Sequence, residues 1–392
     1  MKNVLEKLII IYVKVLYGLA NSSLNTFRCF IFLRTKPHKV VKKILVFRTG
    51  NIGDVICAFP AIVAIRKNYP KAEIFFLSSP GNKNLSGAKE LSSGLTVVDK
   101  IHIYSNEDIN SLAKVFLFIK TIREEKCDLF IELPQNSTRL KTEFRNIIFA
   151  RLVGCKYGYG FKISTIKIFA QIQSKYLKFV TEEERLLGIL KKEKITSEKV
   201  NYNFQVSKSD QVAVKEVLAK LNKTPIIVFS AFSNFKARNY NTRKFAEIGR
   251  ELVAKYNINI VILGGKADLE KGSLLASLIG PRAVNIFLNL PQTIEFMRHC
   301  KLVISVDSGN IHLASAAGTP SIGLFAAIYL KGQWYPFGNR NIVLRKELEC
   351  HSCFNPYCAQ SHCLDGVSVE EVLTAAGKIL NNDYGEVKDA KS

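Results

Sequence analysis

Acidic residues are scarce in this chain of 392 residues. Asp and Glu number 33 against 56 Lys and Arg, so the formal net charge at neutral pH is +23. A surface short of carboxylates favours polyanionic partners, such as nucleic acid, a phosphorylated glycolipid or an anionic membrane face. The charge does not choose among them, and a compositional bias toward Lys gives the same excess without any partner.

Long apolar runs and a secretion signal are also missing. The apolar stretch Leu8–Val13 is interrupted by Lys14, no small-residue cleavage site follows it, and a membrane span needs about 20 apolar residues. Residues 1–43 instead hold nine Lys and Arg and one acidic residue, Glu6. Because apolar residues recur on one helical face, the arm 1–42 predicts a membrane-surface helix or, alternatively, a helix packed on the protein.

Repeats of solenoid length are absent, and the chain is too long for one ordinary core. From residue 44 onward, short apolar strands alternate with helical stretches, which predicts βαβ units and parallel sheets. The alternation stops in the polar, Lys/Glu-rich stretch 175–210 and resumes at Ile226–Ser230. We therefore predict an α/β protein with two doubly wound, Rossmann-like domains, whose ligands lie at the carboxyl ends of the strands. The predicted bounds are 43–205 and 206–365, followed by a C-terminal helix and polar tail over 366–392.

Cysteines fall into two groups. Five are scattered in apolar contexts, as expected of reduced thiols in the cytosol: Cys29, Cys57, Cys127, Cys155 and Cys300. Four cluster in the segment 350–363, with two histidines between them: Cys350, Cys353, Cys358 and Cys363. This cluster has enough ligands for a tetrahedral metal site. It predicts a structural Zn or Fe ion, with free thiols or disulfides as the alternatives, and no part in catalysis.

The loop after the first predicted strand is the first candidate site. It runs from Arg48 to Asp54, with Asn51 between two glycines, Gly50 and Gly53, that permit a tight turn and close approach of a ligand to the backbone. Asp54 lies near the start of the next helix, which favours its ionised form, so it can accept a proton as a general base. The alternative is a simple helix cap, and the full G-x-G-x-x-G nucleotide signature is missing.

Loops of the second predicted domain carry candidate anion-binding groups. Asp307, Ser308 and Gly309 precede a helix whose first amides form an anion site, and His312 lies one turn further on. After the strand that ends at Ser230, the cations Lys236, Arg238 and Arg243 suit a diphosphate. Asp268 follows Gly264-Gly265 and can bind ribose hydroxyls. Helix caps and a solvated basic loop are the alternatives.

These motifs together resemble a known family. Arg-x-Gly-x-Ile-Gly-Asp at 48–54 is followed by Ala-Phe-Pro-Ala at 58–61, and Asp-Ser-Gly-x-x-His-Leu-Ala-x-Ala-x-Gly-Thr-Pro stands at 307–320. In this order they are similar to the ADP-heptose:lipopolysaccharide heptosyltransferases, which are family 9 glycosyltransferases with the GT-B fold. The resemblance covers roughly residues 43–380 and implies an inverting transfer at a cleft between the domains, with no cofactor required for catalysis.

The resemblance also implies roles for residues. Asp54 matches the catalytic base of the family, and Arg238 stands where a basic residue offsets charge on the departing diphosphate. Asp307, Ser308, Gly309 and His312 match the family's donor-binding loop. Ser230, Lys236 and Asp268 are further donor-side candidates from their places after strands, and the acceptor-side loop comprises Arg48, Gly50, Asn51 and Gly53. The family often has Trp-Pro where this chain has Tyr240-Asn241. Either Lys236 or Arg238 can therefore hold the diphosphate.

We expect transfer of heptose from ADP-heptose to the inner core of lipopolysaccharide, on an acceptor of the lipid A–Kdo type. The expected location is the cytoplasm, peripheral on the anionic inner-membrane surface. Two alternatives are a transferase that glycosylates a protein Ser or Thr hydroxyl and a non-catalytic basic nucleotide-binding protein. Nucleic acid is not an expected partner, because aromatic residues are not interleaved along a basic stripe.

Overall fold

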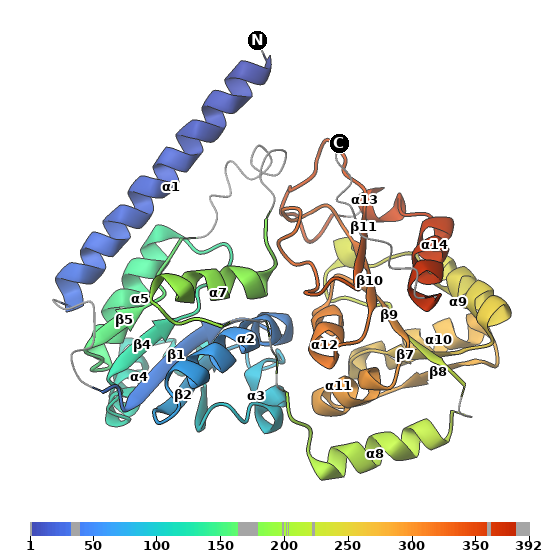
Figure 1. The fold of residues 1–392 in the computed structure, drawn as a ribbon, viewed down its shortest axis with the longest axis horizontal. Coiled ribbons are helices and arrows are strands. Elements are labelled where there is room, and N and C mark those ends of the chain that lie inside the picture. Colours follow the sequence, from blue (N-terminus) through green and yellow to red (C-terminus); the bar gives the residue numbers. More distant parts are fainter. Residues whose placement is uncertain are drawn as a thin grey trace. The chain divides into compact units, whose positions relative to one another are not determined.

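The computed structural model describes residues 2–32, 40–163, 179–197, 200, 202, 204–221, 224–358 and 362–381. The predicted polar tail beyond residue 381 and part of the basic arm lie outside them. The chain divides into two compact units, Met1–Gln205 and Val206–Ser392 (Figure 1). The sequence pattern predicts the domain junction near residue 205.

The first unit is built on a five-stranded parallel sheet in the order β3-β2-β1-β4-β5. Its strands are β1 (Lys43–Thr49), β2 (Glu73–Ser79), β3 (Lys100–Ile103), β4 (Leu129–Glu132) and β5 (Tyr157–Tyr159). β1 pairs with β2 on one side, Ile44 opposite Ile74, and with β4 on the other, Ile44 opposite Leu129. Strands β1, β2 and β4 consist almost wholly of buried residues. Such continuous buried runs are typical of parallel strands covered by helices on both faces.

Helices cover this sheet in two layers. One contains α2 (Ile52–Asn68), whose stretch from Val55 to Ile65 is wholly buried, and α7 (Glu182–Lys192), which packs on it; the short α3 (Ala88–Leu91) also contacts α2. The other contains α1 (Lys2–Phe32), α4 (Leu112–Glu124) and α5 (Leu140–Leu152). Buried residues of α1, α4 and α5 share one apolar cluster with strand residues, including Leu24, Ile122, Ile147 and Phe130. The three helices therefore form one layer.

Helix α1 is longer than the sequence pattern predicts. It runs without a break for 31 residues, and its part Lys7–Phe32 is long and apolar enough, by length and composition, to cross a membrane. By length and composition the segment meets the criterion that the sequence pattern predicts it to miss, because apolar residues continue beyond Lys14. A buried core helix passes the same criterion, so the helix length alone assigns no membrane.

The second unit has a six-stranded parallel sheet in the order β11-β10-β9-β6-β7-β8. Its strands are β6 (Ile226–Ser230), β7 (Asn259–Leu263), β8 (Ala283–Ile286), β9 (Leu302–Val306), β10 (Ser321–Phe325) and β11 (Ile342–Arg345). Its helices are α8 (Lys208–Ala219), α9 (Thr242–Tyr256), α10 (Leu269–Ile279), α11 (Leu290–Arg298), α12 (Gly309–Ala317), α13 (His362–Asp365) and α14 (Val369–Leu380). Helices α9, α10 and α14 share one apolar cluster with the sheet, while α8 and α12 both contact α11.

The predicted fold class is confirmed: both units are doubly wound α/β sheets of the Rossmann-like type. The edge strands β5 and β11 were not predicted. Helix α14 starts as expected, with Ser368 and Glu371 forming a capping box. The central cleft between the domains stays a prediction.

Each sheet has a point where the strand order reverses. In the first unit the chain starts at β1, adds β2 and β3 on one side and then β4 and β5 on the other. In the second unit β6 comes first, β7 and β8 extend one side, and β9, β10 and β11 extend the other. The reversals lie between β1 and β4 and between β6 and β9. Loops leaving the carboxyl ends of these strand pairs are where open α/β sheets bind ligands.

Candidate active site

The loop between β1 and α2 brings a carboxylate to the first of these points. Asn51 is the N-cap of α2, and its backbone N–H donates to Asp54 Oδ2 at 3.1 Å. The loop turns at Gly50, whose φ is +131° and where a Cβ would lie 2.4 Å from the Cβ of Asp54. A side chain at Gly50 would therefore displace Asp54, which is why this position requires glycine.

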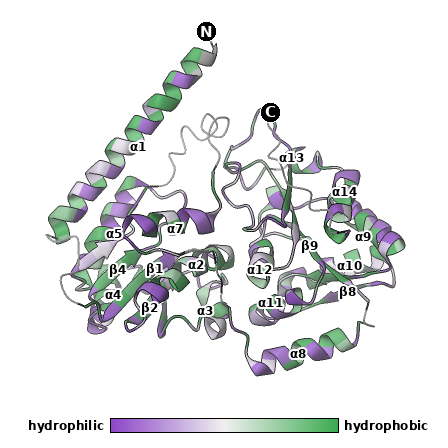
Figure 2. Cartoon of the chain, viewed as in Figure 1, coloured by the Kyte–Doolittle hydropathy of each residue, from purple (hydrophilic) through white to green (hydrophobic). Residues whose placement is uncertain are grey.

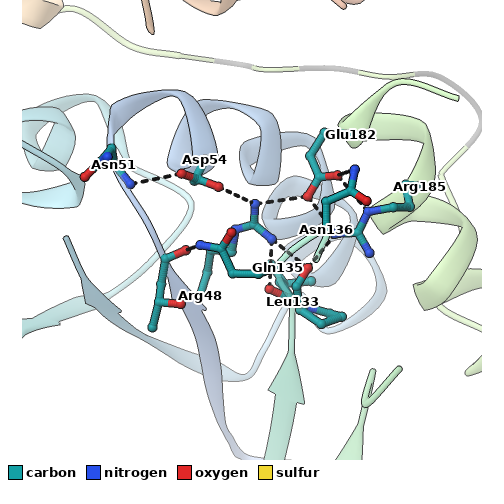
Figure 3. A network of polar contacts seen from close by, with 10 residues as sticks. Arg48, Asn51, Asp54, Leu133, Gln135, Asn136, Glu182 and Arg185 are labelled. Atoms are coloured by element: carbon teal, nitrogen blue, oxygen red, sulfur yellow. Dashed lines mark hydrogen bonds and ion pairs between the residues drawn. The ribbon is translucent and has the colours of Figure 1, made fainter. Parts of the chain in front are cut away.

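The other carboxylate oxygen of Asp54 accepts a hydrogen bond from Arg48. Its side chain is 0 % exposed, and its Nη2 donates to Asp54 Oδ1 at 3.1 Å (Figure 3). Its Nη1 donates to two backbone carbonyls after β4, Leu133 O at 3.1 Å and Pro134 O at 2.7 Å. Arg48 thus links the loops after β1 and β4. The Asp54 side chain keeps 18 % of its surface exposed.

A buried glutamate that the sequence pattern did not single out completes this network. Glu182, at the start of α7, accepts from Arg48 Nη2 at 3.0 Å and from Asn136 Nδ2 at 3.0 Å. Arg185, one turn further on, donates to both Glu182 oxygens, at 2.6 and 2.7 Å. The sequence pattern predicts a Lys/Glu-rich helix over Glu182–Glu193, close to the domain junction, with no part in the site. No sequence motif links Glu182 to Asp54. Its part in the site is visible only in the structure, where its buried carboxylate lies between Arg48 and Arg185.

The charges of this network stabilise one another. Burial opposes the charge of Arg48, but the carboxylates of Glu182 and Asp54 outweigh burial and raise the pKa of the guanidinium. Burial likewise opposes the charge of Glu182, yet Arg185 and Arg48 lower the pKa of its carboxyl below the ordinary value. The first unit therefore holds an ionised Arg–Glu pair under a partly exposed Asp54.

The second unit has its own Arg–Asp pair at its strand reversal. Arg238 lies in a short 3-10 helix after β6, and Asp307 follows β9. Arg238 Nε lies 3.3 Å from Asp307 Oδ2, and its Nη2 donates to the Tyr329 hydroxyl at 2.8 Å. The guanidinium also lies over the rings of Phe235 and Tyr329, 4.8 and 4.9 Å from their centroids. Here Asp307 is the more buried partner, 5 % exposed against 15 % for Arg238.

The remaining donor-loop residues gather around the start of α12. Ser308 is its N-cap, and Gly309 is its first residue, so their amides open the helix at this point. Ser230 ends β6, and its hydroxyl accepts from Asn310 Nδ2 at 2.8 Å. His312 is buried and packs edge-on against Trp334, with the ring centroids 6.4 Å apart. The structure thus brings Ser230, Arg238, Asp307 and Ser308 to one end of β6 and β9.

The segments after β6 and β7 hold three further predicted donor-side residues. Lys236 is exposed on the 3-10 helix that also carries Arg238. Asp268 follows β7, and its carboxylate accepts from the Gly265 N–H at 3.0 Å, which caps the 3-10 helix Lys266–Asp268. Arg243 lies in the first turn of α9, which Asn241 caps. Tyr240, which stands where the family often has Trp, is buried, and its hydroxyl donates to Val367 O at 2.7 Å.

The four clustered cysteines belong to the second unit. Cys350 and Cys353 are exposed, Cys358 is half-buried and Cys363 is buried, and no disulfide joins them to one another in the described part of the chain. The backbone N–H of Ala327 donates to Cys363 Sγ at 3.3 Å. Burial, with Cys350 and Cys353 nearby, raises the pKa of the Cys363 thiol. Among the described residues, these four sulfurs are not gathered closely enough to hold one ion, so the metal site stays a prediction that rests on the ligand types, which suit zinc or iron.

Fold and loops define a class of protein: two Rossmann-like units, one presenting a carboxylate and the other a guanidinium beside a helix N-terminus. The particular family follows from comparison. The model of glycosyltransferase family 9 (heptosyltransferase) matches residues 116–364. The chain belongs to this family and is a glycosyltransferase. The matched residues include Arg238 and Asp307 and begin after Asp54.

Curated relatives are similar over most of their length. Lipooligosaccharide heptosyltransferase 2 of Campylobacter jejuni is 21 % identical over 87 % of this chain and 99 % of its own. A putative glycosyltransferase of Haemophilus influenzae is 23 % identical over 73 % of this chain and 82 % of its own.

Solved structures share the fold at lower identity. A family 9 glycosyl transferase from Veillonella parvula has a TM-score of 0.70 at 17 % identity, over 89 % of this chain and 100 % of that chain. The E. coli ADP-heptose lipopolysaccharide heptosyltransferase II has a TM-score of 0.63 at 18 % identity, over 87 % and 99 %. The iron-containing dodecameric glycosyltransferase TibC of E. coli has a TM-score of 0.51 at 12 % identity, over 89 % and 78 %.

Proposed function

We propose that this glycosyltransferase moves heptose from ADP-heptose to the inner core of lipopolysaccharide, with inversion and with Asp54 as general base. Family membership and the names of two relatives, a lipooligosaccharide heptosyltransferase and an ADP-heptose lipopolysaccharide heptosyltransferase, support the donor and acceptor. The observation that carries the proposal is the pair of Arg–Asp contacts. The carboxylate is the less buried member of one pair and the guanidinium of the other, and these are the two groups that this transfer needs.

The proposed chemistry uses both ends of the transferred bond. The acceptor hydroxyl oxygen attacks C1 of the heptose, the bond from C1 to the diphosphate oxygen breaks, and ADP leaves with the electron pair. Asp54 takes the hydroxyl proton, since Arg48 and the Asn51 N–H fix its two oxygens. Arg238 and the first amides of α12 stabilise the negative charge that grows on ADP.

The test is turnover with the full chain. Purified protein is mixed with ADP-heptose and a heptose-free acceptor of the lipid A–Kdo type, and ADP release and acceptor mass are followed together. We expect release that depends on the acceptor, with one heptose added, and its loss in Asp54→Asn. Transfer to a protein Ser or Thr hydroxyl instead would show that the proposed acceptor is wrong. Unchanged release of ADP in Asp54→Asn would show that Asp54 is not the general base.

The proposed location is the cytoplasmic face of the inner membrane, with the chain held there peripherally. A soluble nucleotide sugar and a lipid-linked acceptor can meet only at such a surface, and the arm 1–43 is basic. Cell fractionation tests this: the protein is expected with membranes and is released by high salt or carbonate. Recovery in the soluble fraction at low salt would contradict the location.

The cysteine segment is a proposed structural metal site, held by Cys350, Cys353, Cys358 and Cys363. The structural neighbour TibC is an iron-containing glycosyltransferase, and the sulfur ligands present here fit zinc or iron. Bound metal would tie the segment together without entering the transfer. Metal analysis of purified protein is expected to give about one ion per chain, reduced in Cys353→Ser. A metal-free, fully folded protein would leave four structural thiols.

A further inference from the structure

The outer surface of the α1/α4/α5 layer carries many large apolar side chains. Helix α1 carries exposed apolar residues every three or four positions: Val4, Leu8, Ile11, Val15 and Leu19, with Leu5 and Tyr12 beside them. Its opposite side holds the buried Val13 and Leu24. The apolar stripe therefore points away from the body that α1 packs on, and Figure 2 shows hydrophobic residues along the whole helix.

The neighbouring helices continue this surface. Leu112 and Phe116 on α4 are 90 % and 71 % exposed, and Leu117 beside them is also exposed. On α5, Ile148 and Leu152 are exposed on the side away from the sheet. Since all three helices share one buried cluster against the sheet, their outward residues face the same side. Clustered large apolar side chains on an outer face indicate an interaction surface.

The charge on the same helices is of one sign. Among the side chains described on α1, α4 and α5, eight cations are exposed against one acid, Glu124: Lys7, Lys14, Lys114, Lys120, Arg123, Lys141, Arg145 and Arg151. The helices α8, α9 and α10 of the other unit expose six cations and four acids: Lys208, Lys215, Arg243, Arg250, Lys255 and Lys271, with Glu216, Glu247, Glu251 and Glu270. Apolar side chains among cations, with few acids, match a bilayer of anionic lipid.

We propose that the outer face of α1, α4 and α5 docks on an anionic lipid bilayer, with α1 lying along the surface. Crossing is disfavoured because Leu24 and Phe32 are part of the buried core cluster. Tyr17 and Ala20 also pack against that cluster, so only about residues 4–16 remain free of it, or roughly 20 Å of helix against about 30 Å of hydrocarbon. The inference deepens the proposed function, since it rests on a lipid-linked acceptor, and it adds the body of the first unit to the contact.

Vesicle binding of the full chain tests the surface. Unsubstituted protein is expected to sediment with vesicles that contain phosphatidylglycerol and much less with pure phosphatidylcholine. The variant Leu112→Ser/Phe116→Ser/Leu117→Ser changes only exposed side chains of α4 and is expected to bind roughly tenfold more weakly. A matched control, Val212→Ser/Leu269→Ser/Leu274→Ser, changes exposed apolar residues of α8 and α10 and is expected to bind normally. Equal binding of the α4 variant and the unsubstituted protein would overturn the proposal.

Two further measurements separate the remaining explanations. Light scattering without vesicles is expected to give the same oligomeric state for the α4 variant and its parent. If the unsubstituted protein is an oligomer and the α4 variant is a monomer, the face binds a second copy of the chain, and the proposal of bilayer docking is overturned. ADP release on a water-soluble, acyl-free acceptor is expected to be unchanged in the α4 variant, while Asp54→Asn binds vesicles normally. Failure of transfer and failure of docking are thereby distinguished.

Discussion

The two units differ in which partner of an Arg–Asp pair is buried. Each places an Arg–Asp contact where its strand order reverses, but in the first unit the arginine is the buried partner and in the second the aspartate is. The exposed member is then a carboxylate, Asp54, or a guanidinium, Arg238. Which side of the pair faces solvent decides whether the loop accepts a proton or binds an anion.

The buried members are compensated differently. Arg48 has a second carboxylate, Glu182, and two carbonyls, so it stays charged inside the unit. Asp307 has Arg238 and, more distantly, Arg345, yet burial still raises the pKa of its carboxyl. The first pair is therefore the more strongly held, and the second is more easily altered by a ligand that competes for Arg238.

The largest expected effect is the loss of the exposed carboxylate. Asp54→Asn keeps the shape and the contact to Arg48 but cannot accept a proton, so turnover should fall by about 10²–10⁴. The measurement is steady-state ADP release. Asp268→Asn, on a carboxylate that caps a 3-10 helix, is the matched control and should stay within about threefold of the parent. A similar loss in both variants would mean that Asp54 has no special role.

Removing the buried counter-charge of the first unit should cost stability. Glu182→Gln leaves Arg48 and Arg185 without their shared carboxylate, and breaking a buried ion pair costs about 3–5 kcal/mol. Urea unfolding should show this as a lower free energy of unfolding. Glu216→Gln, at an exposed position on α8, should change it by less than about 0.5 kcal/mol. If Glu182→Gln unfolds like its parent, the network contributes little to the fold.

The partly exposed guanidinium of the second unit should set donor affinity. Arg238→Lys keeps the charge but loses the forked contacts to Tyr329 and the Asp307 carbonyl, so KM for ADP-heptose should rise by about 10–100-fold. Lys236→Gln, two residues away and exposed, should change KM by less than about threefold. A larger rise in KM for Lys236→Gln than for Arg238→Lys would assign the diphosphate to Lys236.

The smallest effect is a difference in pH dependence. The pKa of Glu182 lies below its ordinary value of 4.5, so its contribution to stability is present above that pH and is lost as the pH falls. The pKa of Asp307 lies above its ordinary value of 3.8, so its ionisation costs stability as the pH rises. Between about pH 3.5 and 7, the difference in Tm from the parent should move in opposite directions for Glu182→Gln and Asp307→Asn. Parallel curves would contradict the contrast between the pairs.

Sequence patterns predicted the alternating strands, the two sheets and the loops that carry Asp54, Arg238 and Asp307. These features are local, since each depends on a strand, a turn and a helix start within a few residues. Glu182 lies 134 residues from Arg48, and α7 follows residues whose pattern gave no sign of burial. Three consecutive acids resemble a solvated helix start, and only the tertiary fold shows that Glu182 meets two arginines.

The predicted sets were also broader than what the structure brings together. Lys236 and Asp268 looked equivalent to Arg238 and Asp307 in the sequence, because all four follow strands. The strand order separates Asp268, which follows β7, because β6 and β9 are neighbours at the reversal. Lys236 follows β6 as Arg238 does, and differs from it in being exposed. A sequence cannot show which strands are adjacent when the crossovers are helical.

The most direct test of the central claim is titration of ADP into Asp54→Asn and Arg238→Lys, both as full chains. The opposite exposure of the two pairs predicts that Asp54→Asn binds ADP like the parent while its turnover is lost. Arg238→Lys is predicted to bind ADP at least about tenfold more weakly. Loss of ADP affinity in Asp54→Asn, or unchanged affinity in Arg238→Lys, would contradict the division of labour between the two units.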